Sequence, residues 1–147
     1  MVVLLTVLLT AIDQAVKYWA VTGLQPLERI PVWDGVFSLA YLENRGAAFG
    51  MLQNSRWLLI GLTVLVLAGL TVYLWKKRPE NKLLRVSLAL IYAGALGNLI
   101  DRVLRGYVVD LFSFDLIDFP VFNVADICVV CGVGLLVLYV LFLHDKE

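Results

Sequence analysis

Six polar or charged residues stand close together in the second half of this chain, between long apolar segments. They are Asn98, Asp101, Arg102, Asp110, Asn123 and Asp126. Ionisable groups are costly to keep beside lipid-facing segments, so such a cluster indicates a functional site. Two aspartates in one site can work as a general base and a general acid. We therefore expect two of these carboxyl groups to hydrolyse a peptide bond at a membrane surface.

Asp126 is the first candidate for the pair. It follows Asn123 by three residues, which is the spacing of a capping box at a helix start. The positive end of that helix would stabilise its carboxylate and keep it ready to act as a base. Capping alone would also explain both residues without any catalysis. The spacing by itself does not decide between a capping role and a catalytic role.

Asp101 and Asp110 compete to be its partner. Arg105 stands four residues after Asp101, so an ion pair within one helix could occupy that carboxylate. Asp110 has apolar neighbours, and an apolar environment raises the pKa of a carboxyl group. A second carboxylate nearby would raise that pKa further, so that the two groups share one proton. The pattern favours Asp110.

Metal-dependent and serine-triad chemistry are not expected. Zinc sites use His or Cys ligands, and the only histidine, His144, is expected in a cytoplasmic tail. Cys128 and Cys131 lie in an apolar run, which favours inert thiols over reactive ones. We expect neither a metal nor a cofactor.

Two further pairs have helical spacing of four residues. Asp13 and Lys17 predict an ion pair that ties the first helix to its neighbours. Asn98 and Arg102 place an amide and a guanidinium on one helix face. These groups could hold helices together, or Arg102 could bind a peptide carbonyl or a lipid headgroup.

The elements that must position these residues are predicted to be membrane helices. Hydrophobic residues make up 61% of the 147 residues and charged residues 16%, against roughly 45–50% and about 25% in soluble domains. The zero net charge gives no general attraction to nucleic acid. Each of four apolar segments approaches the ~20 residues that cross a bilayer as a helix. They span residues 2–20, 57–75, 83–104 and 122–143, within a single domain of residues 1–147.

A basic cluster sets the predicted orientation. Lys76, Lys77, Arg78, Lys82 and Arg85 lie around the link between the second and third segments. The positive-inside rule places this link in the cytoplasm. Both chain ends are then cytoplasmic, and the polar residues of helices one, three and four come to one depth near the outer face.

The two outer segments have different compositions. Residues 21–56 contain short apolar runs and chain breakers, which predict a small β cradle on the membrane surface. Residues 105–121 mix aromatic and acidic side chains and are expected to form an interfacial flap. The predicted fold is thus an all-α membrane protein with four transmembrane helices, a small extracytoplasmic β cradle and a flap.

With these residues laid out, the chain resembles the lipoprotein signal peptidase family, bacterial signal peptidase II, over nearly its whole length. The resemblance rests on five motifs in order: Asp13-Gln14-x-x-Lys17, Glu43-Asn44-Arg45-Gly46-Ala47-Ala48-Phe49-Gly50, Gly94-x-x-Gly97-Asn98-x-x-Asp101-Arg102, Val108-Val109-Asp110, and Phe122-Asn123-x-Ala125-Asp126. Each motif is weak alone, whereas five in order with four membrane segments are specific.

The resemblance implies an aspartic endopeptidase of the bacterial inner membrane that works without a cofactor. Its substrate would be a prolipoprotein, cleaved just before a cysteine that carries a diacylglyceryl group. The implied catalytic pair is Asp110 and Asp126. The implied substrate-binding residues are Asn44, Arg45, Asn98, Arg102 and Asn123, and the implied supporting residues are Asp13, Lys17 and Asp101. Membrane lipids are the other expected partners, and a monomer is expected.

Two other functions compete with this interpretation. A small proton-coupled membrane carrier would hold its carboxylates near the bilayer midplane, whereas here they lie near one surface and no inverted repeat is evident. A structural membrane subunit would use the polar residues only to pack helices. In that case the Asp110→Asn and Asp126→Asn proteins would keep full activity.

Overall fold

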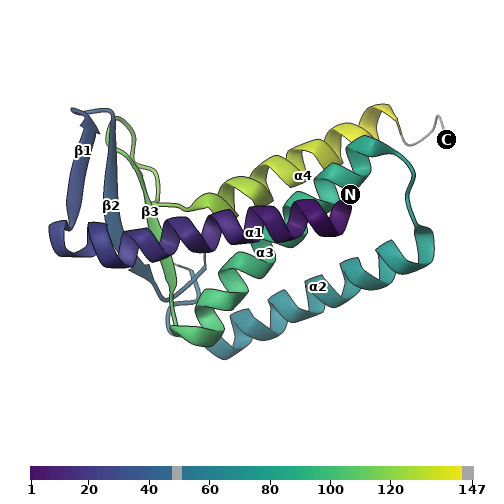
Figure 1. The fold of residues 1–147 in the computed structure, drawn as a ribbon, viewed down its shortest axis with the longest axis horizontal. Coiled ribbons are helices and arrows are strands. Elements are labelled where there is room, and N and C mark those ends of the chain that lie inside the picture. Colours follow the sequence, from purple (N-terminus) through teal and green to yellow (C-terminus); the bar gives the residue numbers. More distant parts are fainter. Residues whose placement is uncertain (48–50, 144–147) are drawn as a thin grey trace.

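The computed structural model describes residues 1–47 and 51–143 and contains four long helices and a small sheet (Figure 1). The helices are α1 (Val2–Trp19), α2 (Arg56–Lys77), α3 (Lys82–Leu104) and α4 (Val124–Phe142). A π-helical turn at Ala20–Leu24 and a 3-10 turn at Gln25–Leu27 continue α1. All four spans are long and apolar enough to cross a membrane. The predicted fold class is therefore confirmed.

The helix boundaries follow local chemical signals. The side chain of Asn81 accepts hydrogen bonds from the backbone of Leu83 and Leu84 and so caps the start of α3. Asn123 caps α4 in the predicted capping box with Asp126. Each boundary lies within two residues of its predicted position, because apolar length and capping are local properties of the sequence.

Helix α3 packs against each of the other three helices. Its approach to α4 and α1 depends on two glycines. A Cβ atom on Gly94 would lie 2.3 Å from the carbonyl oxygen of Ala125, and one on Gly97 would lie 2.5 Å from Asp13 Oδ2. A side chain at either position would therefore push the helices apart.

The sheet has three antiparallel strands in the order β1 (Arg29–Trp33), β2 (Phe37–Asn44) and β3 (Val108–Phe114). It lies at one end of the helices, whereas the N-terminus, the α2–α3 link and the end of α4 lie at the other (Figure 1). Strand β2 pairs Leu39 with Phe112 and Leu42 with Asp110, and the register shifts between these two pairs.

The sheet differs from the prediction in one respect. Residues 105–121 were expected to form a flap separate from the cradle, but Val108–Phe114 forms the third strand of the cradle itself. The pairing satisfies the second edge of β2, which would otherwise present unpaired backbone groups. The residues after β3 lead to α4, and Phe122 returns to pair with Phe112 of β3 in a single bridge. The rings of Phe119 and Phe122 pack edge to face with centroids 5.7 Å apart.

Candidate active site

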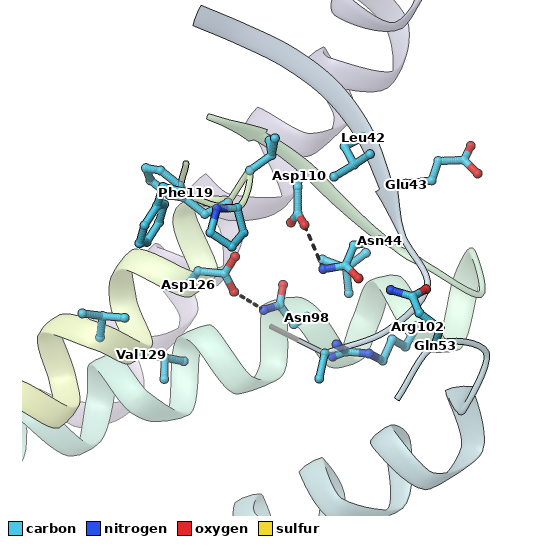
Figure 2. Close-up of a pocket in the computed structure, with 16 residues that line it drawn as sticks. Leu42, Glu43, Asn44, Gln53, Asn98, Arg102, Asp110, Phe119, Asp126 and Val129 are labelled. Atoms are coloured by element: carbon cyan, nitrogen blue, oxygen red, sulfur yellow. Dashed lines mark hydrogen bonds between the residues drawn. The ribbon is translucent and has the colours of Figure 1, made fainter. Parts of the chain in front are cut away.

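A cavity of about 560 Å³ opens between α3, α4 and the adjoining ends of β2 and β3 (Figure 2). Its polar wall includes Asp110, Asp126, Asn44, Asn98 and Arg102. Its apolar wall includes Val129 and Val130 of α4 and Phe119–Phe122 of the turn before α4. Both aspartates selected from the sequence therefore face one cavity, although 15 residues separate Asp110 from Asp126 in the chain.

Asp110 lies on β3 and is 1% exposed. Its carboxylate accepts hydrogen bonds from Asn123 Nδ2 at 2.6 Å and from Asn44 Nδ2 at 3.0 Å. Burial of this side chain, reinforced by the negative charge of Asp126, raises the pKa of Asp110 to about 7. Asp110 is therefore partly protonated near neutral pH, as a general acid must be.

Asp126 stands in the first turn of α4. Its Oδ2 accepts the backbone N–H of Asn123 at 3.1 Å, and its own backbone N–H donates to Asn123 Oδ1 at 2.9 Å. Its Oδ1 accepts from Asn98 Nδ2 at 2.8 Å and borders the cavity (Figure 2). Capping thus uses one carboxylate oxygen and leaves the other in the site.

Four of the five predicted substrate-binding residues lie at the cavity wall or directly behind it. Asn44, Asn98 and Arg102 line the cavity, and Arg102 Nη2 also donates to the carbonyl oxygen of Gly46 at 3.0 Å. Asn123 is fully buried behind the two aspartates and contacts both.

Arg45 is placed differently from the other four. Its guanidinium is exposed, pairs with Glu43 at 3.0 Å and lies over the ring of Tyr107. It is not part of the cavity wall. The end of its motif, residues 48–50, falls outside the described residues, as does His144 and with it the tail position predicted for that residue.

The three predicted supporting residues form a buried ion cluster beneath the cavity. Asp13, Lys17 and Asp101 are each 0% exposed. Lys17 Nζ lies 3.0 Å from Asp13 Oδ2 and 3.1 Å from Asp101 Oδ2. The predicted pairing of Asp13 with Lys17 is confirmed, and the weaker Asp101–Arg105 pair is also present at 3.6 Å. Asp101 does not line the cavity, whereas Asp110 and Asp126 both do.

Gln14 and Gln53 are among the residues near the site that were not selected from the sequence. Gln14 donates to Asp13, to Asp101 and to the carbonyl oxygen of Gly97. Gln53 reaches the cavity wall from the loop before α2. Gln14 belongs to the first motif, so its spacing offered a signal, whereas the position of Gln53 depends on a loop that carries no periodic pattern.

Comparison with known proteins agrees with this geometry. Residues 5–142 match the family model described as signal peptidase (SPase) II. The chain is 46% identical to a lipoprotein signal peptidase of Clostridium acetobutylicum, over 92% of this chain and 90% of that protein. It is 44% identical to a lipoprotein signal peptidase of Clostridioides difficile, over 99% and 97% of the two chains.

Solved structures show the same fold. One, described as a bacterial membrane enzyme determined by the in meso method at 2.3 Å resolution, superposes with a TM-score of 0.91 and 32% identity. The match covers 99% of this chain and 91% of that one. The family match, the relatives and the shared fold lead to one conclusion: this chain belongs to the signal peptidase II family of membrane aspartic peptidases.

Proposed function

We propose that this peptidase releases signal peptides from diacylglyceryl-modified prolipoproteins, using Asp110 and Asp126 as its catalytic pair. The observation that carries the proposal is the placement of two carboxyl groups, from β3 and α4, on the wall of one cavity. One of them has a pKa raised to about 7, and the other accepts hydrogen bonds from Asn98 and from the backbone of Asn123. Such a pair supplies one acid and one base at the same pH.

The proposed reaction needs only water and these two groups. The carboxylate of Asp126 takes a proton from water, and the hydroxide attacks the scissile carbonyl carbon. The protonated carboxyl of Asp110 polarises the carbonyl oxygen. When the C–N bond breaks, the leaving nitrogen takes the proton of Asp110. The proton held by Asp126 then passes to Asp110, which restores the starting state.

The amides and the guanidinium of the cavity would hold the peptide. Asn44 donates to Asp110 and Asn98 donates to Asp126, so each aspartate has one amide partner at the cavity wall. Arg102 lies on the same wall and could donate to a substrate carbonyl. These groups would hold the scissile bond between the two carboxyl groups, where correct placement accelerates the reaction.

The apolar wall favours a lipid-bearing substrate. Val129 and Val130 belong to both the cavity and the membrane-spanning helix α4, and Val130 is 71% exposed. The cavity therefore continues from the carboxyl groups to a surface that faces hydrocarbon. A substrate with acyl chains next to the cleaved bond could keep those chains in the bilayer while its peptide reached the aspartates.

The proposed orientation places the site at the outer face of the bacterial inner membrane, with both chain ends in the cytoplasm. It is supported by the basic residues Lys76–Arg78 at the helix end opposite the sheet (Figure 1). A monomer is proposed because one chain supplies both carboxyl groups.

The decisive experiment reconstitutes the purified protein in lipid vesicles with a diacylglyceryl-modified prolipoprotein and measures signal-peptide release. We expect Asp110→Asn and Asp126→Asn to reduce turnover by about 10²–10⁴-fold, the usual contribution of general acid–base catalysis. Asp118→Asn is the matched control, because Asp118 is an exposed aspartate outside the cavity wall. Near wild-type turnover in a folded Asp110→Asn protein would refute the assignment and favour a packing role.

A further inference from the structure

Lys17 makes three polar contacts in a fully buried position on α1. Its ammonium contacts Asp13 Oδ2 at 3.0 Å, Asp101 Oδ2 at 3.1 Å and Asn98 Oδ1 at 2.9 Å. All three protons of the ammonium therefore have an acceptor. Two carboxylates and one ammonium lose their hydration here, and replacing such a cluster by apolar residues is often neutral or stabilising. Helix packing alone gives little reason for these charges.

The two carboxylates of this cluster also hold the backbone beside each proposed catalytic residue. Asp13 Oδ1 accepts the N–H of Ala125 at 2.8 Å, and Ala125 directly precedes Asp126. Asp101 Oδ2 accepts the N–H of Val109 at 3.1 Å, and Val109 directly precedes Asp110. One ammonium thus joins the two backbone segments from which both aspartates project.

A third connection leads to Asp126 through a side chain. Lys17 donates to Asn98 Oδ1, and Asn98 Nδ2 donates to Asp126 Oδ1 at 2.8 Å. Gln14 reinforces the cluster by donating to Asp13 Oδ2 at 3.2 Å and to Asp101 Oδ1 at 3.4 Å. The space for Asp13 exists because Gly97 has no side chain.

We propose that Lys17 is a positioning residue that sets the separation of Asp110 and Asp126 by holding, through Asp101 and Asp13, the backbone before each of them. This inference rests on the proposed function, since it concerns the same two aspartates. Lys17 itself touches neither the substrate cavity nor the reacting atoms, and its effect on the reaction passes through its two carboxylate partners and Asn98.

The test compares three variants in the vesicle assay, each checked for folding by thermal denaturation. Lys17→Met removes the ammonium that joins Asp13 and Asp101, and leaves both buried carboxylates without it. Asp13→Asn/Lys17→Met also removes one of those charges and keeps an acceptor for the Ala125 N–H, while Asp101 keeps Arg105. Thr10→Val is the control: Thr10 Oγ1 donates to the carbonyl oxygen of Ala93 on α3, on the same side of α1 but outside the cluster.

We expect Lys17→Met to lower kcat by about 100-fold, the scale of a 1 Å misplacement of catalytic groups, with a smaller change in KM. Loss of the nearby positive charge also raises the pKa of Asp110, whose other charged neighbours are Asp126 and Arg102. The alkaline limb of the pH–rate profile should then move to higher pH. The double variant should regain thermal stability but keep the low kcat and the displaced profile. Thr10→Val should lose stability with kcat and profile unchanged.

Three outcomes would overturn the positioning role. One is a folded double variant with the kcat and the pH–rate profile of the wild type. Another is a Thr10→Val protein whose pH–rate profile matches that of Lys17→Met. The third is failure of both Lys17 variants to fold, because stability alone would then account for the cluster. A wild-type protein that releases no signal peptide would instead refute the proposed function.

Discussion

The side-chain amide of Asn123 donates to Asp110 Oδ1 at 2.6 Å, across the boundary between α4 and β3. The carbonyl oxygen of the same side chain caps α4 by accepting the N–H of Asp126 at 2.9 Å. One residue therefore fixes the start of the helix that carries one aspartate and contacts the carboxylate of the other. Helix capping and site geometry are coupled in this protein.

Replacements of Asn123 should separate its two roles. Asn123→Ala removes both, and loss of the cap alone costs about 1 kcal/mol of the free energy of unfolding. Asn123→Ser keeps a capping oxygen but has no amide to reach Asp110. We expect Asn123→Ser to melt close to the wild type and still to lose at least about 10-fold in turnover, the effect of a lost hydrogen bond of about 1.4 kcal/mol. Equal turnover in wild type and Asn123→Ser would contradict the role of the amide.

The activity of the wild type should decline on the alkaline side of neutrality. Asp110 must keep its proton to act as the acid, and its pKa is raised to about 7. The value of kcat/KM should therefore fall as pH rises through this value, because the ionised form accumulates. Rates of signal-peptide release between pH 5 and 9 test this expectation. A rate that keeps rising to pH 9 would show that Asp110 works as a carboxylate.

Asp110 should also make folding stability depend on pH. Its pKa is about 7 in the folded protein and near 3.8 in the unfolded chain, so the folded state binds the extra proton between these values. The contribution of Asp110 to the free energy of unfolding is then fully present below about pH 4. It decreases as pH rises to about 7, by at most about 1.4 kcal/mol for each pKa unit of difference. In Asp110→Asn this dependence disappears. Melting temperatures at pH 5 and pH 8 should differ more in the wild type than in the variant, and parallel curves would exclude this contribution.

Gly97 should be intolerant of the smallest side chain. A Cβ atom there would lie 2.5 Å from Asp13 Oδ2, the oxygen that binds Lys17. We expect Gly97→Ala to lower the free energy of unfolding by about 1–3 kcal/mol, as overpacking does, and to reduce turnover through the ion cluster. Gly61→Ala is the control, because no atom lies within 4 Å of a Cβ at that position on α2. Similar losses in both variants would point to a general effect of alanine in these helices.

Labelling in intact cells can test the orientation. Asp34 lies in the exposed turn between β1 and β2, and Glu80 is exposed in the link between α2 and α3. After both native cysteines are replaced by alanine, a membrane-impermeant thiol reagent should label Asp34→Cys but not Glu80→Cys. Permeabilised cells should show labelling of both. The reverse pattern in intact cells would invert the proposed topology.

Local features of the sequence determined much of this protein. Apolar length predicted the four helices within two residues, since crossing a bilayer requires about 20 apolar residues in a row. The spacing of Asn123 and Asp126 predicted a capping box, and that of Asp13 and Lys17 predicted an ion pair. Each of these interactions lies within about one helix turn, where residues close in the sequence are also close in space.

Only the tertiary structure decided how these local pieces meet. The pairing of β3 with β2 joined the predicted flap to the cradle and brought Asp110 beside Asn44. The packing of α1 on α3 placed Lys17 between two carboxylates, whereas Arg45 turned away to Glu43 and Tyr107. The contacts Asn44–Asp110, Lys17–Asp101 and Arg45–Tyr107 join residues tens of positions apart. They depend on strand register and on how closely the glycine faces of the helices approach. These are properties of the packed molecule, so they cannot be predicted from any single segment of the chain.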